Sequence, residues 1–259
     1  MTRIAITRPV SRSIVDCELT HLAREPIDYA AAVEQHAAYE AVLGGSVGEI
    51  VRAPAAHDLP DAVFVEDMAV VLDEVAVMTR PGAVSRRREL DGVEQVLGRY
   101  RDVVRIEAPG TLDGGDVLRI GRQLFVGQSS RTNDAAIDQL RALLSTHGYD
   151  VKAVNVHGCL HLKSAVTAVG VDSLLGNSAW IDRDAFGQRE WIEVDRSEPG
   201  AANALWVGES VIYPREHART ADRLRARLQP AGISLHLVDA CELAKAEGGV
   251  TCCSLVLTT

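Results

Sequence analysis

The chain of 259 residues contains no apolar run of about 18 residues, so the sequence predicts no membrane-spanning helix. Its first five residues lack the apolar core of a signal peptide. A Cys-x-x-Cys pair is missing as well, which argues against a structural zinc site. Basic residues number 27 against 36 acidic ones, for a net charge of −9. This balance argues against a general nucleic-acid binder, because such proteins usually carry a basic face.

Aromatic residues are scarce, at 4%, whereas apolar residues of all kinds make up 47% of the chain. Aliphatic side chains and alanine must therefore fill the core, and a chain of this length can form one large domain or two small ones. The number of cysteines is odd; the five are Cys17, Cys159, Cys241, Cys252 and Cys253. An odd number in a long chain with no secretion signal indicates reduced thiols and a cytoplasmic location, not a disulfide scaffold.

The most distinctive segment is the tail, which runs from Gly248 to Ser254 and carries both Cys252 and Cys253 before an apolar strand. Paired glycines let the backbone bend and bring another backbone or a ligand close. A cysteine between a flexible elbow and a rigid strand is well placed to be a nucleophile. Two candidate partners, His161 and Asp113, lie far upstream, so only a folded chain could join the three.

A repeat runs through the chain. Residues 68–79, 116–127 and 203–214 each read as a β-hairpin, with alternating apolar residues around a central turn. Residues 163–170 and the tail fit more loosely. The five unit heads, Asp67, Asp116, Lys163, Asn203 and Cys252, are separated by 49, 47, 40 and 49 residues. This period predicts five units closed around an axis, in one α/β domain over residues 1–259 with near-fivefold pseudosymmetry.

Helices are expected between the hairpins. Asp28, Asn133 and Thr220 are predicted to cap helices, and Ser85 is predicted to start another. Asp239 and Glu242 form a capping box just before the tail. Each unit is thus predicted to contain a hairpin, a helix and a further strand.

The residues suited to chemistry gather at the unit heads. Equivalent positions in a closed array point to one end of its axis, so these remote side chains should converge. They are Asp61, Glu66 and Asp67 at the first head, Asp113 and Asp116 at the second, His161 at the third and Cys252 at the fifth. Each alone also fits a structural role, such as a core cysteine or a turn carboxylate. Their joint recurrence at matching phases favours an active site.

The combined pattern resembles the dimethylarginine dimethylaminohydrolase family of guanidine-modifying enzymes. The matching runs are residues 60–67, 79–83, 85–87, 112–117, 130–133, 160–163, 201–203 and 248–252. They occur in the family's order and cover nearly the whole chain. The family's α/β propeller of five ββαβ units, the pentein fold, agrees with the repeat.

The resemblance implies hydrolysis of Nω-methylated arginines to citrulline and a methylamine. Cys252 would be the nucleophile, His161 the general acid and base, and Asp113 the residue that orients the histidine. Glu66 and Asp67 would hold the guanidinium, with Phe64 against its plane. Asp113 stands where some bacterial relatives have glutamate.

The resemblance also implies contacts with the amino-acid end of the substrate. Asp61, Arg86 and Arg131 would contact that end or shape the pocket. Glu247 stands where relatives usually have aspartate, so a contact with the substrate amino group there could alter specificity. Residues 16–19 match the family poorly; Leu19, at the end of this stretch, is the lid residue that we assign to substrate binding.

Other functions remain open. An arginine or agmatine deiminase or an amidinotransferase would use the same Cys-His-carboxylate site. A more remote alternative is a non-catalytic metal-binding protein that uses Cys252, Cys253, His157 and His161. The enzymatic interpretation requires no metal or organic cofactor, and zinc is expected only as an inhibitor at Cys252. The expected partner is a small guanidinium compound, without nucleic acid or membrane, bound by a monomer or homodimer.

Only one of the two adjacent cysteines can face the site. Neighbouring strand residues point to opposite faces, so a strand would place Cys252 and Cys253 on opposite sides. The family resemblance selects Cys252 as the reactive one. Cys253 is therefore expected to pack in the core.

Overall fold

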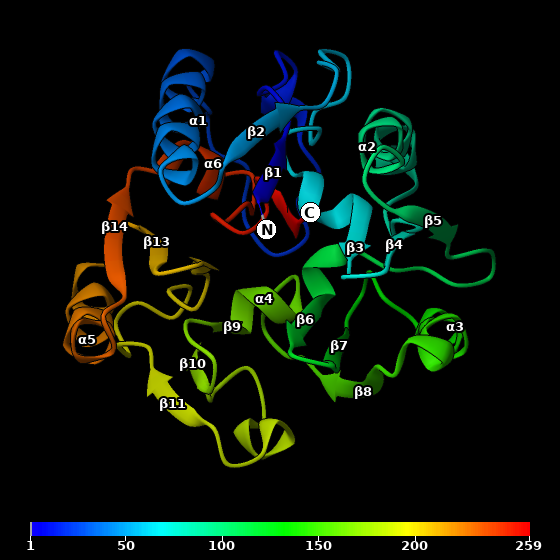
Figure 1. The fold of residues 1–259 in the computed structure, drawn as a ribbon. Helices are drawn as coiled ribbons and strands as arrows, with labels where there is room; N and C mark the ends of the chain where they lie inside the picture. Colours follow the sequence, from blue (N-terminus) through cyan, green and yellow to red (C-terminus); the bar gives the residue numbers. More distant parts are fainter. Residues whose placement is uncertain (1) are drawn as a thin grey trace.

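The computed structural model describes residues 2–259. Five three-stranded sheets surround a central axis, and the longer helices lie around the outside (Figure 1). The inner strands are β3 (Ala69–Val71), β6 (Val117–Ile120), β9 (Val166–Ala168), β12 (Leu205–Val207) and β15 (Leu255–Thr258). Each inner strand follows one of the predicted unit heads, so the predicted fivefold repeat is confirmed.

Every sheet has the same order. The inner strand pairs antiparallel with a middle strand, and the middle strand pairs parallel with an outer strand. A parallel pair needs a crossover, and in four units an α-helix provides it. The middle strand, helix and outer strand of these units are β4 (Val75–Met78), α2 (Leu90–Leu97) and β5 (Asp102–Arg105); β7 (Gln123–Gln128), α3 (Asp134–Leu144) and β8 (Asp150–Asn155); β13 (Ser210–Pro214), α5 (Ala218–Leu228) and β14 (Ser234–Val238); and β1 (Arg3–Thr7), α1 (Tyr29–Gly44) and β2 (Glu49–Arg52).

The remaining unit departs from the predicted pattern. Between β10 (Ser173–Gly176) and β11 (Glu190–Glu193) the crossover contains only a short 3₁₀ helix, Arg183–Phe186. The Asp182 side chain accepts the N–H of Asp184 at its start, and Gly187 ends it with φ of +70°. This unit is the one with the 40-residue interval. The prediction of a helix in every unit is therefore wrong here, because the interval is too short for one.

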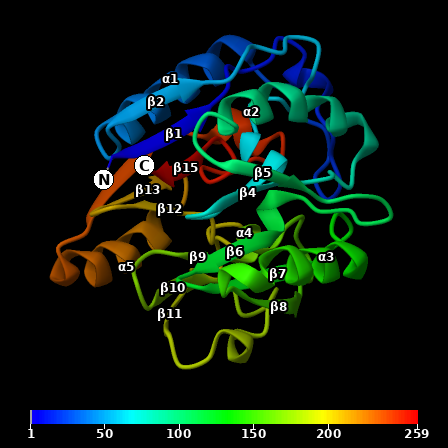
Figure 2. The same ribbon diagram turned by 45° about the vertical axis from the view of Figure 1, so that its right-hand side comes forward.

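The two ends of the chain close the ring. The last strand, β15, pairs antiparallel with the first, β1, which places Leu257 opposite Ile4 and Leu255 opposite Ile6. Figure 2 shows β1 and β15 side by side, with both termini near them. The fifth unit is thus built from both termini. No helix within residues 2–259 is long and apolar enough to cross a membrane.

Some predicted helix starts are confirmed and others are wrong. Asp28 and Asn133 cap α1 and α3 with their side chains. Ser85 instead lies inside a 3₁₀ segment that leads into α2. Thr220 is buried within α5, and its hydroxyl accepts the N–H of Asp195. The capping box is also wrong, since α6 (Cys241–Ala244) has no side-chain cap.

The segments before the inner strands meet at one end of the axis. Residues 65–68 and 114–116 form short 3₁₀ turns, residues 162–165 form the single turn α4 (Leu162–Ala165), and a turn at residues 250–253 precedes β15. The turns at 65–68 and 114–116 contact each other, and α4 contacts the second. This contact brings the chemistry of remote unit heads together, as the repeat predicts.

Candidate active site

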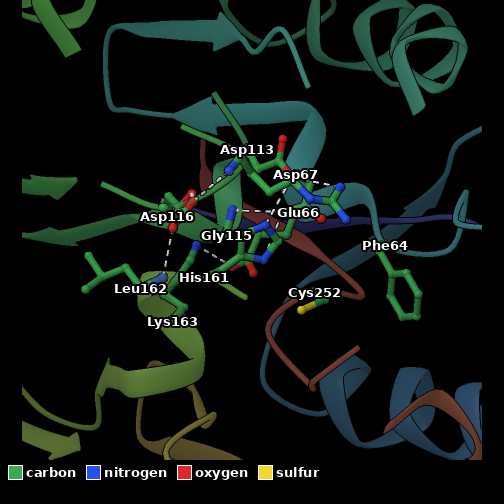
Figure 3. Close-up of polar contacts among 12 residues, drawn as sticks. Phe64, Glu66, Asp67, Asp113, Gly115, Asp116, His161, Leu162, Lys163 and Cys252 are labelled. Carbon is green, nitrogen blue, oxygen red and sulfur yellow. Dashed lines mark hydrogen bonds and ion pairs between the residues drawn. The ribbon is translucent and has the colours of Figure 1, made fainter. Parts of the chain in front are cut away.

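His161 lies between two carboxylates at the start of α4 (Figure 3). Its Nε2 is 3.0 Å from Oδ2 of Asp113, and its Nδ1 is 3.9 Å from Oδ1 of Asp67. All three side chains are buried. Burial alone would lower the pKa of His161, but the charge of Asp67 and the hydrogen bond to Asp113 raise it to about 9. His161 is therefore an imidazolium, protonated on both ring nitrogens, at neutral pH, and it can donate a proton.

Asp67 is held as a carboxylate. Its Oδ2 accepts Nη1 of Arg86 at 2.6 Å, and its Oδ1 accepts the N–H of Gly115 at 2.9 Å. Burial alone would raise the pKa of Asp67, but His161 and Arg86 lower it to about 2. Asp67 therefore remains a buried carboxylate at neutral pH and can bind a cation.

Asp113 is anchored behind the histidine. Its Oδ1 accepts the N–H of Gly82 at 2.9 Å, and its Oδ2 faces both His161 and Nη1 of Arg131, the latter at 3.7 Å. The side chain is fully buried. A carboxylate fixed in this way can hold the imidazole in one orientation, which is the predicted role of Asp113.

Cys252 lies in the turn before β15, with only 9% of its surface exposed. Its Sγ accepts the N–H of Gly249 at 3.3 Å. Burial, together with the nearby carboxylates of Glu66 and Asp67, raises the pKa of the Cys252 thiol to about 12. The sulfur is therefore a neutral thiol at neutral pH, and a cation beside it would favour the thiolate.

Cys253 packs in the core, as predicted, but for a different reason. It is 1% exposed within an apolar cluster that includes Ile212 and Val250, and its Sγ lies 3.6 Å from the carbonyl oxygen of Gly249. Both cysteines lie in a turn, so strand alternation does not separate them. The two side chains line different cavities: Cys252 lines the one that also contains His161, and Cys253 lines one that contains Tyr39 and Val250.

Eight of the predicted site residues line one narrow cavity of about 20 Å³. They are Asp61, Phe64, Asp67, Arg86, Arg131, His161, Glu247 and Cys252. The Phe64 ring packs on Gly248, where a Cβ atom would lie 2.1 Å from the ring. A glycine is therefore required beside the aromatic wall.

Three residues assigned to the amino-acid end contact the loop that covers this cavity. Oδ2 of Asp61 accepts the N–H of Glu18 at 3.1 Å, and Nη2 of Arg131 donates to Oγ1 of Thr20 at 2.9 Å. The Glu247 carboxylate accepts three consecutive backbone N–H groups, those of Thr20, His21 and Leu22. In this structure these side chains hold residues 18–22, which we call the lid loop, over the cavity.

Leu19 belongs to the same lid loop. It is partly buried and packs against the apolar cluster that includes Phe64 and Cys252. The structure therefore places Leu19 near the site, and its contact with substrate stays a prediction.

Arg86 faces inward rather than toward the opening. Its guanidinium binds Asp67 at 2.6 Å, the Glu89 carboxylate at 2.9 Å and the Phe64 carbonyl at 3.1 Å. Burial alone would lower the pKa of Arg86, but the surrounding carboxylates raise it. Arg86 therefore holds Asp67 in place, and both of its predicted roles toward the substrate pocket stay predictions.

Glu66 lies on the other side of the turn at residues 250–253. It lines a separate cavity of about 220 Å³ among the inner strands. Its two oxygens bind Nζ of Lys163 at 2.6 Å and Oγ1 of Thr251 at 2.7 Å. Its predicted contact with a guanidinium stays a prediction.

Sequence reasoning missed several residues that support the site. Glu89 is buried beside Arg86, and burial raises its pKa to about 7 against the pull of Arg86. The sequence places Asp116 at a unit head but does not indicate its role. In the structure its carboxylate accepts hydrogen bonds from the hydroxyls of Ser129 and Thr132 and from the N–H of Leu162. The three-residue spacing of Arg86 and Glu89 within residues 84–89 is the signal that could have identified this pair.

One group in the described residues, Asp67, Asp113 and His161, could hold a metal ion, with ligand atoms within 4.8 Å of one another. Its atoms already bind one another, Arg86 or backbone N–H groups. The residues of the metal-binding alternative are not gathered, because His157 is exposed while Cys253 is in the core.

The chain matches no family model. It is 38% identical over 258 residues to the N(G),N(G)-dimethylarginine dimethylaminohydrolase of Pseudomonas aeruginosa, covering 98% of this chain and 99% of that protein. The protein of the same name from Streptomyces coelicolor is 41% identical over 254 residues, covering 98% and 96%. The chain belongs to the dimethylarginine dimethylaminohydrolase family. The predicted family is therefore confirmed.

Solved structures agree with this membership. The dimethylarginine dimethylaminohydrolase of Pseudomonas aeruginosa, as a mutant complexed with citrulline, superposes with a TM-score of 0.93 at 36% identity, covering 99% of this chain and all of that one. The N-terminal domain of the cyanobacterial arginine dihydrolase ArgZ superposes with a TM-score of 0.85 at 19% identity. The second likeness shows the fold alone. The pentein fold, which the family resemblance implies and with which the repeat agrees, is confirmed.

Proposed function

We propose that the protein hydrolyses Nω-methylated L-arginine, such as asymmetric dimethylarginine, to L-citrulline and a methylamine. The observation that carries this proposal is the meeting of Cys252, His161 and Asp67 in one cavity, with Asp113 behind the histidine. A thiol, a protonated imidazole and a buried carboxylate are the groups that attack on a guanidinium requires. The family relatives named for this reaction support the choice of substrate.

The first half of the reaction transfers the amidine group to the enzyme. Asp67 binds the guanidinium, and the substrate charge favours the thiolate of Cys252, whose proton passes to solvent. Sγ attacks the central carbon to form a tetrahedral adduct. His161 then donates its proton to the departing amine, which leaves a thiouronium on Cys252.

The second half restores the enzyme. His161, now neutral, takes a proton from water, and the resulting hydroxide attacks the thiouronium carbon. The carbon–sulfur bond breaks as the proton of the added hydroxyl passes to the sulfur, citrulline leaves, and the enzyme regains its thiol and imidazolium. In sum, one water is consumed for each citrulline and amine formed. Asp113 keeps the imidazole oriented through both proton transfers.

The test is a substrate panel with product identification. Purified protein is incubated separately with asymmetric dimethylarginine, monomethylarginine, arginine and agmatine, and citrulline, methylamines and ammonia are measured. Citrulline with dimethylamine from asymmetric dimethylarginine is the expected result. Ammonia release from arginine without activity on methylated arginines would overturn the proposal. A monomeric or homodimeric state and a cytoplasmic location stay predictions.

A further inference from the structure

The Asn203 side chain joins two segments of the active site from outside the cavity. Its Oδ1 accepts the N–H of Thr251 at 3.0 Å, while its Nδ2 donates to Oγ1 of Thr251 at 2.9 Å and to the carbonyl of Lys163 at 3.1 Å. Thr251 directly precedes Cys252, and Lys163 follows His161 in α4. One amide therefore spans the segment that carries the sulfur and the segment that carries the imidazole.

The Thr251 hydroxyl extends this link to the opposite side of the turn. Because Asn203 Nδ2 supplies one proton, the single hydroxyl proton of Thr251 is free to go to Oε2 of Glu66, at 2.7 Å. The backbone N–H of Glu66 in turn donates to the carbonyl of Cys252 at 3.1 Å. The turn at residues 250–253, which carries Cys252, is thus fixed by Asn203 on one side and by Glu66 on the other.

Gly249 contacts both the Asn203 side-chain amide and the Cys252 sulfur. A Cβ atom at Gly249 would lie 2.4 Å from the Asn203 side chain, so this turn packs directly on the amide. The N–H of the same glycine donates to Sγ of Cys252 at 3.3 Å. A displacement of the Asn203 amide would therefore move a group that contacts the sulfur.

We propose that Asn203, acting through Thr251, is a positioning residue that fixes the Cys252 sulfur relative to His161. This role rests on the proposed function, in which Cys252 is the nucleophile. Asn203 and Thr251 do not line the narrow cavity that contains Cys252 and His161. Their loss should therefore affect turnover far more than substrate binding, because misplacing reacting atoms by about 1 Å can cost about 100-fold in rate.

A pair of variants at Thr251 provides the first test. Thr251→Val keeps the shape of the side chain but removes the hydroxyl, whereas Thr251→Ser keeps the hydroxyl. We expect Thr251→Val to lower kcat by about 10- to 100-fold with KM within about threefold, and Thr251→Ser to recover most of the turnover. Equal kcat values for the valine and serine variants would overturn the role of the hydroxyl.

Asn203→Ala and a matched control provide the second test. Asn177 is also a buried amide, which donates to the carbonyl of Pro199 and accepts the N–H of Ala179, each at 2.9 Å. Both alanine variants should lose thermal stability, but only Asn203→Ala should lose kcat. Equal losses of kcat would mean that the amides act only through stability, and would overturn the proposal.

The two tests remain separate from the test of the proposed function. If Asn203→Ala does not fold, the Thr251 pair decides the outcome by itself. Wild-type protein that forms no citrulline would overturn the proposed function. Active wild-type protein with an unaffected Thr251→Val variant would overturn only the positioning role.

Discussion

At the scale of single residues, the proton positions in the site determine the order of events. The pKa of His161 is raised to about 9 and that of Cys252 to about 12, so both groups hold protons at neutral pH. A resting thiol does not attack, and a resting imidazolium cannot act as a base. Binding of a cationic guanidinium lowers the pKa of the Cys252 thiol, because a positive charge stabilises the thiolate. The nucleophile therefore forms only when substrate is bound.

The raised pKa of His161 leads to a prediction for the pH profile. In the free enzyme the reacting form, thiolate with imidazolium, has one proton fewer than the resting form, so kcat/KM should rise with pH up to about 9 and then level off. Asp113→Asn removes a negative charge 3.0 Å from Nε2, which lowers the histidine pKa and should move this break in the profile to lower pH. Citrulline formation measured from pH 6 to about 10.5 checks this. The exposed carboxylate variant Asp150→Asn is the control, and a break at the same pH in Asp113→Asn would contradict the argument.

The adjacent cysteines offer a direct comparison. Cys252→Ser removes the nucleophile and should lower turnover by at least about a thousandfold. Cys253→Ser places a hydroxyl near the Gly249 carbonyl and should keep most of the turnover, with a stability cost of about 1 kcal/mol. Citrulline assays and thermal unfolding of both variants test the assignment. The reverse pattern of activity would make Cys253 the nucleophile.

At the scale of elements, the lid loop depends on one unusual residue. Glu247 has φ of +58°, a left-handed conformation that is uncommon for a residue with a side chain. This conformation accompanies a carboxylate that receives three backbone N–H groups from residues 20–22. The cavity beneath, at about 20 Å³, is too small for an amino acid, so the lid loop must open to admit one. Opening therefore requires these hydrogen bonds to break.

Glu247→Gln should loosen the lid loop. The Gln amide has one acceptor oxygen, whereas the Glu247 carboxylate has two that share a negative charge. Hydrogen bonds to charged groups are also stronger than those to neutral ones. We expect backbone amide exchange at Thr20, His21 and Leu22 to rise by about tenfold. Hydrogen–deuterium exchange measures this, with the exposed Glu25→Gln, just after the lid loop, as the control. Equal exchange in the two variants would show that Glu247 does not hold the loop.

The elements that the sequence predicts correctly are the ones set by local patterns. Alternating apolar residues and turns identify the hairpins, and Asp28 and Asn133 cap the helices that begin next to them. Thr220 fails as a cap because its hydroxyl bonds to Asp195, in a neighbouring segment. A cap prediction assumes that a side chain serves its own helix, and tertiary contacts override it here.

The same distinction separates the predicted from the missed site residues. Cys252 is a unit head, and His161 and Asp113 lie just before unit heads, so the repeat alone places them together. Asn203 is a unit head as well, but its hydrogen bonds to Thr251, 48 residues away, exist only once two units pack. The contact between Glu247 and the lid loop joins residues more than 220 positions apart, and it is equally invisible to local reasoning.

At the scale of the whole molecule, the position of the chain ends follows from the pseudosymmetry. Each unit has an inner strand followed by its middle strand, and only between β15 and β1 is this connection missing. The ends lie together, because the N–H of Thr2 bonds to the carbonyl of Thr259 at 3.1 Å and the reverse bond is 2.9 Å. The missing connection between β15 and β1 is therefore one of five equivalent connections. The ring should tolerate a break at one of the other four.

A circular permutant tests this equivalence. A short glycine–serine linker would join Thr259 to Thr2, which makes a hairpin of β15 and β1. The new ends would lie at Val171, which is 73% exposed between β9 and β10 and thus corresponds to the natural break. Such breaks in exposed loops are usually tolerated, so the permutant should unfold cooperatively and keep turnover within about threefold. Deletion of residues 255–259 is the contrasting variant, because it removes the inner strand that closes the ring and leaves β1 unpaired on one edge. A permutant that fails to fold, or a deletion variant that stays active, would show that closure through β1 and β15 does not hold the five units together.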